Sequence, residues 1–213
     1  MRQLVRNQDD TQATRRRYNR IAPIYDLMKV IVEQVAYSQW RESLWSHVAG
    51  REVLEVGVGT GKNLRYYPDN VRVTAVDFSR RMMERAVRRA RTTVDETRFL
   101  RTDAQHMAFA DGTFDAAVTT FVFCSVPDPV LGLREIKRVV RRGGKVLLLE
   151  HVRINAPIIG PVMDLLDPVS VRIMGPHIAR RTVQNVRKSG LVVDHVEELT
   201  LGALVKLIFA HVP

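Results

Sequence analysis

A glycine-rich turn, EVGVGTG, follows the first short run of aliphatic residues and is the segment of this sequence best suited to holding a ligand. Gly57, Gly59 and Gly61 allow tight turning and close backbone approach, and a following helix would present free amide groups to an electronegative ligand atom. The dinucleotide pattern GxGxxG does not fit, because its last glycine would fall on Lys62 or on Leu64. The turn therefore indicates a ligand other than a dinucleotide.

Three acidic residues are expected at the same ends of the strands as this turn. Glu55 would repel a pyrophosphate, but it can help to hold a cationic amino-acid group. Asp77 closes the next expected strand, where a carboxylate can accept both hydroxyls of a ribose, and Asp103 follows the third, where it could accept a hydrogen bond from an adenine amino group. One acid at a strand end often only caps a helix, but three together predict a nucleoside that carries an amino-acid tail.

Short β-branched and aliphatic runs alternate with helical patterns, which is typical of a parallel sheet covered on both faces. We expect strands at 52–56, 71–77, 97–101, 114–119, 145–150, 191–196 and 203–211, the last two as a hairpin at the sheet edge. We expect helices at 62–67, 80–91, 129–140 and 180–189, after two N-terminal helical stretches. The fold class is therefore α/β. Ligands of such sheets bind at the carboxyl ends of the strands, where the turn and the acids meet.

Composition narrows the class of protein further. The 213 residues fit one domain, spanning 1–213, and the single cysteine, Cys124, excludes an internal disulfide and disfavours structural zinc. Neither a secretory signal nor a membrane span is apparent, so we expect the cytoplasm. The net charge of +10 favours anionic partners such as acidic lipid, although a solvated arginine-rich surface would have the same composition.

Four segments together resemble the class I S-adenosylmethionine-dependent methyltransferases: EVGVGTG, TAVDFS, TDAQHMAF and VVRRGGKVLLLEH. The resemblance implies a Rossmann-like seven-stranded, mostly parallel sheet with a reversed last strand and helices on both faces. It also implies S-adenosylmethionine as the cofactor, S-adenosylhomocysteine as its product, and no metal. By similarity, the cofactor-binding residues are Tyr25, Glu55, Gly57, Gly59, Gly61, Asp77, Phe78, Ser79, Met82, Asp103, Ala104 and Phe121.

The N-terminal segment YNRIAPIYDLM is similar to the entry segment of the ubiquinone and menaquinone biosynthesis C-methyltransferases and of bacterial phosphatidylethanolamine N-methyltransferases. In both groups the tyrosine that matches Tyr25 lies over the cofactor. We therefore expect residues 1–48 to form a helical lid. Its apolar face could dock on an anionic bilayer, flanked by Arg15, Arg16, Arg17 and Arg20; the same periodicity also fits a packed lid with no membrane role.

An apolar, proline-spaced segment, 156–178, stands where such enzymes elaborate their substrate cover. A lipid or a prenylated ring would need such a cover, whereas a small polar substrate would not. The alternative is a core helix on the sheet. Beside it, GPHIARRT provides His177, Arg180 and Arg181 as substrate-binding residues that could grip a phosphodiester, although the two arginines could equally be surface residues.

These features favour N-methylation of the phosphatidylethanolamine headgroup, because the tail from 165 to 208 looks most like the soluble-type bacterial enzymes. Tyr25, His151 and His177 are the candidate catalytic residues that could accept a proton from the amine. A quinone-ring C-methyltransferase or a small-molecule thiol or amine methyltransferase is the alternative. Nucleic acid is not an expected partner, because FVFCSVPDP stands where a base-handling motif would be. The expected partner is a lipid substrate at the inner face of an anionic membrane.

Overall fold

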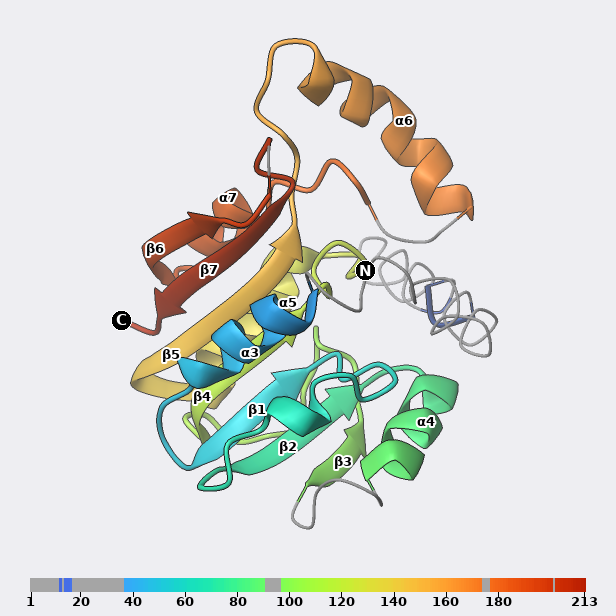
Figure 1. Ribbon diagram of the computed structural model, residues 1–213. Coiled ribbons are helices and arrows are strands. Elements are labelled where there is room, and N and C mark those ends of the chain that lie inside the picture. The colour runs from blue at the N-terminus through green and yellow to red at the C-terminus, as the bar shows by residue number, and fades with distance from the viewer. Residues whose placement is uncertain (1–11, 13, 17–36, 91–96, 174–176, 201) are drawn as a thin grey trace, which may run out of the picture.

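A seven-stranded sheet forms the centre of the computed structural model, which describes residues 12, 14–16, 37–90, 97–173, 177–200 and 202–213 (Figure 1). Its strands are β1 (Glu52–Val56), β2 (Arg72–Asp77), β3 (Arg98–Arg101), β4 (Phe114–Thr120), β5 (Val140–His151), β6 (Val192–Glu198) and β7 (Val205–His211). Their order is β3-β2-β1-β4-β5-β7-β6. The first five strands are parallel, β7 runs antiparallel to β5, and β6 pairs antiparallel with β7. The α/β sheet, its reversed last strand and the edge hairpin are confirmed.

Helices cover both faces of this sheet. They are α3 (Ser38–Ser46), α4 (Arg80–Ala90), α5 (Pro129–Val139), α6 (Ile159–Ile173), α7 (Thr182–Lys188) and a 3₁₀ turn, η2 (Leu64–Tyr66). Successive residues of β5 show the two layers: Val146 and Leu148 pack with residues of α5 and α7, whereas Leu147 and Leu149 pack with residues of α3 and α4. A strand buried on both faces needs a continuous apolar run, which is why this segment does not alternate.

Three elements differ from the sequence prediction, the first being α6, a helix in the segment that was predicted as an apolar cover and not among the expected helices. The helix expected at 62–67 is only the turn η2, since Tyr67 is already extended at φ −63° and ψ 129°. Pro68 follows, and a proline disfavours helical backbone in the residue before it. The last parallel strand begins at Val140 rather than 145, directly after α5, and its pairing with β4 shifts register between Phe114 and Ala116.

The topology brings the predicted chemical groups to one edge of the sheet. The glycine turn follows β1, Asp77 ends β2, Asp103 follows β3 and Phe121 follows β4. Because the strands are parallel, these four points lie at their carboxyl ends. Within the described ranges, none of the helices is long and apolar enough to cross a bilayer.

The two glycines in β5 give a direct test of the chain path there. A Cβ on Gly144 would lie 2.5 Å from the Val140 side chain and 2.6 Å from the Asp115 carbonyl oxygen, whereas a Cβ on Gly143 would meet nothing within 4 Å. Gly143→Ala should cost about 1 kcal/mol of unfolding free energy, from its φ of +72° alone. Gly144→Ala should cost ~3 kcal/mol, because a backbone oxygen cannot move aside. Urea unfolding measures both, and equal losses would contradict this path.

Candidate cofactor site

The glycine turn is held in a left-handed conformation at alternate residues. Gly57, Gly59 and Gly61 have φ values of +76°, +57° and +79°, a region that side-chain-bearing residues rarely adopt. A Cβ on Gly57 would lie 2.4 Å from Val122, and one on Gly61 would lie 2.7 Å from Leu64, whereas Gly59 has its nearest neighbour at 4.0 Å. Gly57 and Gly61 therefore permit close packing, and Gly59 faces open space.

Asp77 connects this turn to the helix that follows β2. One carboxylate oxygen accepts a hydrogen bond from the Gly59 amide at 2.9 Å, and the other accepts one from the Ser79 amide at 2.8 Å. Burial raises the pKa of Asp77 to about 6, although these amide hydrogen bonds oppose the shift. The Phe78 amide also stabilises the ionised group, and of the roughly four acceptor positions of a carboxylate at least one then remains for a hydroxyl group of a ligand.

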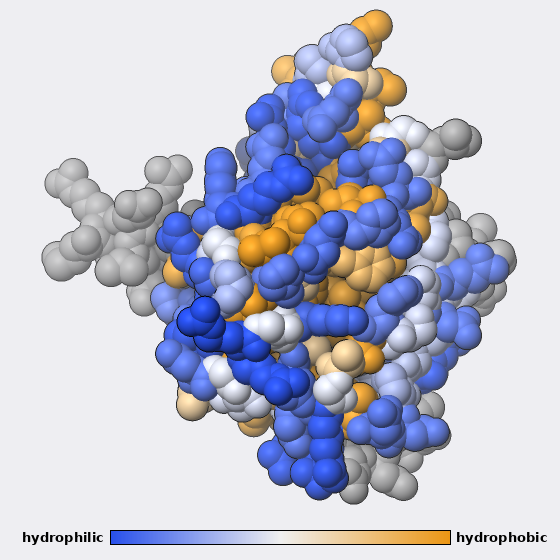
Figure 2. Space-filling model, turned by 90° about the vertical axis from the view of Figure 1, so that its left-hand side faces the viewer, coloured by the Kyte–Doolittle hydropathy of each residue, from blue (hydrophilic) through white to orange (hydrophobic). Residues whose placement is uncertain are grey.

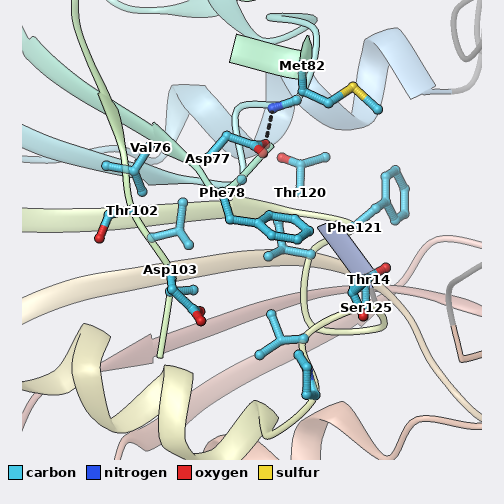
Figure 3. A pocket seen from close by; sticks show the side chains of 17 residues that line it. Thr14, Val76, Asp77, Phe78, Met82, Thr102, Asp103, Thr120, Phe121 and Ser125 are labelled. Atoms are coloured by element: carbon cyan, nitrogen blue, oxygen red, sulfur yellow. Dashed lines mark hydrogen bonds between the residues drawn. The ribbon is translucent and has the colours of Figure 1, made fainter. Parts of the chain in front are cut away.

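A pocket opens beside Asp77 at the carboxyl ends of the strands (Figure 3). Its empty space of about 740 Å³ includes the solvent at the open mouth of the pocket. Asp77 and Asp103 supply its carboxylates, Phe78 and Phe121 its aromatic rings, and Thr14 its only described residue from the N-terminal segment. Such a mixture of apolar walls and a few acidic acceptors suits a nucleoside.

A smaller hollow adjoins the pocket on the other side of the glycine turn, and both are lined by Gly57, Gly59, Thr120 and Phe121. Its remaining walls include the two cationic side chains Arg41 and Lys62, together with Val58, Thr60 and Asn63. The pair of hollows thus continues from an acidic end at Asp77 to a basic end beside α3.

Glu55 lies behind the turn and has no exposed surface. Its carboxylate accepts hydrogen bonds from the side-chain amide nitrogen of Asn63 at 2.5 Å and from the Tyr67 hydroxyl. The side-chain oxygen of Asn63 in turn accepts a hydrogen bond from Arg41 at 2.6 Å. Burial raises the pKa of Glu55 to about 7. In the unliganded protein this acid therefore fixes the base of the turn, and its contact with the cationic tail of a ligand stays a prediction.

The structure brings eight of the predicted cofactor-binding residues together on the pocket wall: Gly57, Gly59, Asp77, Phe78, Met82, Asp103, Ala104 and Phe121. Glu55, Gly61 and Ser79 lie behind that wall. Ser79 is fully buried, and its hydroxyl oxygen accepts a hydrogen bond from the Met82 amide at the start of α4. Tyr25 lies outside the described residues, as does most of the expected lid.

Sequence reasoning missed a second wall, made by the segment after β4. Thr120, Val122, Ser125, Val126 and Pro127 line the pocket there, and Thr14, Val56, Val76 and Thr102 complete its lining. Gln105 was missed as well: it is buried, and its side-chain oxygen accepts a hydrogen bond from the Asp128 amide at 3.0 Å. The only signal for this wall was its place after a strand whose neighbours carry the ligand-binding residues.

Of the described residues predicted for catalysis and substrate binding, His151, His177 and Arg180 contact this second wall and are not on the pocket lining. Phe121 stacks on His151 with ring centroids 4.3 Å apart. The His177 amide donates to the Cys124 carbonyl at 2.8 Å, and Arg180 donates to the Val126 carbonyl at 2.8 Å. Arg181 is exposed at the start of α7. Their chemical roles stay predictions.

A methyltransferase-domain family matches residues 54–148 of this chain. The chain is 38% identical over 148 residues to a phosphatidylethanolamine N-methyltransferase of Cereibacter sphaeroides, covering 67% of this chain and 70% of that one. It is 32% identical over 172 residues to a demethylmenaquinone methyltransferase of Renibacterium salmoninarum, covering 79% and 69%. The chain belongs to the S-adenosylmethionine-dependent methyltransferases.

The solved structures agree on the fold of this methyltransferase. An S-adenosylmethionine-dependent methyltransferase from Thermotoga maritima superposes with a TM-score of 0.71, covering 93% of this chain and 99% of that one, at 19% identity. The cofactor is S-adenosylmethionine, and the pocket suits it, since Asp77 can accept from the ribose and the described lining of the main pocket has no cationic side chain that would repel a sulfonium. When bound, this group supplies an activated methyl.

Asp77 makes the pH dependence of cofactor binding predictable. Protonation of the Asp77 carboxylate removes a hydrogen-bond acceptor for the ribose. The affinity for S-adenosylmethionine should therefore fall as the pH drops from 7 to 5, with a midpoint near the Asp77 pKa of about 6. Asp77→Asn should bind more weakly at pH 7 and lose this part of the pH dependence. Isothermal titration calorimetry measures both.

The unliganded protein should show the opposite trend. The folded-state pKa of Asp77 lies above the ordinary value of 3.8, so its contribution to stability is present below that value and is lost as the pH rises through about 6. Glu55 and Glu150, both raised to about 7 by burial, act in the same direction. Parallel rises of affinity and of stability with pH would contradict the assignment.

Proposed function

We propose that this methyltransferase transfers a methyl group to the amine of phosphatidylethanolamine, at the surface of an anionic membrane such as the inner face of the cytoplasmic membrane. The relative from Cereibacter sphaeroides supports this substrate, but quinone methyltransferases match about as well. The observation that carries the proposal is the orientation of α6, whose apolar residues face away from the rest of the protein.

The polar side of α6 is the side that contacts the rest of the protein. Arg153 pairs with both carboxylate oxygens of Asp164 at 2.8 Å, and Asp167, one turn further on, lies 2.6 Å from the His177 ring. Met163 and Gly160 are buried on the same side. These contacts fix the helix with its two acidic residues toward the rest of the protein, which differs from the usual arrangement of a surface helix.

The apolar side of α6 and its entry is exposed. Leu165 and Ile158 are each 78% exposed, and about half of each of the other members is exposed: Ile159, Val162, Leu166 and Val169. At helical spacing these six residues form one continuous stripe, which we call the α6 stripe. Figure 1 shows α6 projecting from the sheet, and Figure 2 shows orange apolar atoms among bluer ones at the top of the molecule, at the height of α6. Contiguous exposed apolar surface of this kind marks an interaction site.

Basic charge accompanies the stripe. Arg172 in the last turn of α6 and Arg181 at the start of α7 are exposed, and the whole chain carries a net charge of +10. An exposed apolar stripe on a basic protein suits the interface of an anionic bilayer, where the stripe contacts acyl chains and the acidic headgroups attract exposed arginines such as Arg172. A lipid acceptor could then reach the pocket without crossing water.

Arg180 is the side chain best placed to hold the phosphodiester of the substrate. Its guanidinium contacts the Val126 carbonyl on the pocket wall, and burial lowers its pKa. The Nε atom is buried, and no hydrogen-bond partner for it exists among the residues that the structure describes. A desolvated guanidinium with an unused donor favours an anionic ligand, because a charged hydrogen bond would compensate its burial.

The amine must lose a proton before its lone pair can attack the methyl carbon. His177 is hydrogen-bonded to Asp167, and His151 lies 3.5 Å from the Tyr37 hydroxyl, so each imidazole has a partner that fixes its orientation. Both belong to the shell around the second wall, and either could accept the proton through water, as could Tyr25. The alternative substrate, a quinone ring, also suits an apolar helix, but it has no phosphodiester group that Arg180 could bind.

The α6 stripe can be tested with a charge that costs little stability. Leu165→Glu should leave the unfolding midpoint and the affinity for S-adenosylmethionine unchanged, because the side chain is 78% exposed. Binding to vesicles of phosphatidylethanolamine and phosphatidylglycerol should weaken at least about tenfold, since an apolar contact is replaced by a repelled charge. Leu100→Glu, on the exposed edge of β3, is the matched control. Equal vesicle binding by both variants would remove the support that α6 gives.

Arg180 separates the phospholipid from the quinone acceptor. Arg180→Ala should lower kcat/KM for phosphatidylethanolamine by about tenfold to a hundredfold, the size expected for losing a hydrogen bond to a charged group. The affinity for S-adenosylmethionine should change much less. Arg88→Ala, an exposed arginine of α4, removes the same charge elsewhere. An equal loss of cofactor affinity and turnover in Arg180→Ala would assign the residue to the pocket wall instead of the headgroup.

A further inference from the structure

The second wall of the cofactor pocket begins with a strained residue. Phe121 has φ of +56°, a conformation that costs a bulky residue of the order of 1–3 kcal/mol unless its surroundings compensate. Its amide donates to the Leu149 carbonyl at 2.8 Å, and the chain then turns back over the end of β5. Strain of this kind persists only where neighbouring groups hold it, so the residues that contact the turn determine where the wall lies.

Glu150 is the group that holds this turn. It is fully buried near the end of β5, and its Oε1 atom accepts hydrogen bonds from the Val122 amide at 2.9 Å and the Phe123 amide at 3.1 Å. The next amide, that of Cys124, also stabilises its ionised form. Successive backbone amides that converge on one anion form a nest, and here the anion is a side chain of the protein itself.

A structural carboxyl group at this place is costly by itself. Burial raises the pKa of Glu150 to about 7, and its Oε2 atom is buried with no hydrogen-bond partner in the part of the chain that the structure describes. An apolar residue would avoid that cost but would leave the amides of residues 122–124 without this acceptor. The same oxygen also accepts a hydrogen bond from the Thr119 hydroxyl in β4 at 3.3 Å, but the amides are the larger group of donors, so the benefit mainly concerns the turn.

The turn that Glu150 holds carries much of the pocket lining. Thr120, Phe121 and Val122 stand at its start, and Ser125, Val126 and Pro127 follow. The side chain of Val122 also lies against Gly57, where it would contact any added Cβ. A displacement of this turn would therefore move the second wall and loosen the glycine turn opposite to it.

We infer that Glu150 is a positioning residue of the cofactor pocket: its carboxyl group gathers the amides after β4 and so holds the second wall against S-adenosylmethionine. This inference rests on cofactor binding alone. It therefore stands or falls independently of the phospholipid substrate proposed above, and it can be tested without any methyl acceptor.

Two variants of the full chain test the inference by calorimetric titration with S-adenosylhomocysteine. Glu150→Gln keeps an oxygen that can accept from the amides, so its affinity should stay within about threefold of the unaltered protein, the small loss reflecting a weaker neutral acceptor. Glu150→Ala removes the acceptor, and its affinity should fall by about tenfold or more at temperatures where the protein is fully folded.

Asp115→Ala is the matched control. Asp115 also accepts hydrogen bonds from two backbone amides, those of Arg51 at 2.6 Å and Glu52 at 2.9 Å. Asp115 lies at the start of β4, however, at the amino ends of the strands, whereas the pocket lies at their carboxyl ends. This variant should lower the unfolding midpoint without changing the affinity. A Glu150→Ala variant that binds within about twofold of the unaltered protein would overturn the inference, since a loss of stability without a loss of affinity describes ordinary packing.

Amide hydrogen exchange supplies a test that does not depend on the folding of Glu150→Ala. In the unaltered, unliganded protein, the backbone amides of Val122 and Phe123 should exchange slowly with solvent. In Glu150→Gln, the NMR chemical shifts of these two amides should change, while both amides remain protected from exchange. Rapid exchange of both amides in the unliganded protein would overturn the inference, because no nest would then exist before the cofactor binds.

Discussion

The hydrogen bonds from the Gly59 and Ser79 amides to the Asp77 carboxylate are the interaction on which the pocket depends. They join the glycine turn, the end of β2 and the start of α4 at one buried group. Without the two amides, burial would favour the protonated acid, which accepts fewer hydrogen bonds. The same carboxylate that fixes the unliganded turn thus keeps the acceptor capacity that a ribose requires.

The two sides of the site differ in how they are built. The glycine turn and Asp77 belong to the first half of the sheet, and they are held mainly by backbone amides and by the Glu55–Asn63 pair. The second wall depends on β5 through Glu150 and His151, and on the segment 177–180 through the Cys124 and Val126 carbonyls. Asp167 joins that segment to α6. The side of the pocket that would meet an acceptor is therefore built from the part of the chain that carries the α6 stripe.

Local patterns predicted the central strands well because β1, β2 and β4 are short and largely buried runs, and β2 ends in a chemically distinct residue, Asp77. The same reasoning failed where a single backbone preference decides, as at Tyr67 before Pro68. Glu55 illustrates a further limit: its type and position were predicted, but only the structure places its carboxylate against Asn63 and Tyr67. The composition of residues 156–178 predicted an apolar cover, yet composition does not state which side of a helix faces outward, and the contacts of Asp164 with Arg153 and of Asp167 with His177 show that.

The proposed methyl acceptor is phosphatidylethanolamine, and the destination of the methyl group distinguishes it from a quinone. The protein would be incubated with methyl-labelled S-adenosylmethionine and mixed vesicles that contain phosphatidylethanolamine and demethylmenaquinone together. The account predicts that the label appears in the phospholipid fraction, on the nitrogen of the headgroup. Label in the quinone fraction, with none in the phospholipid, would contradict it.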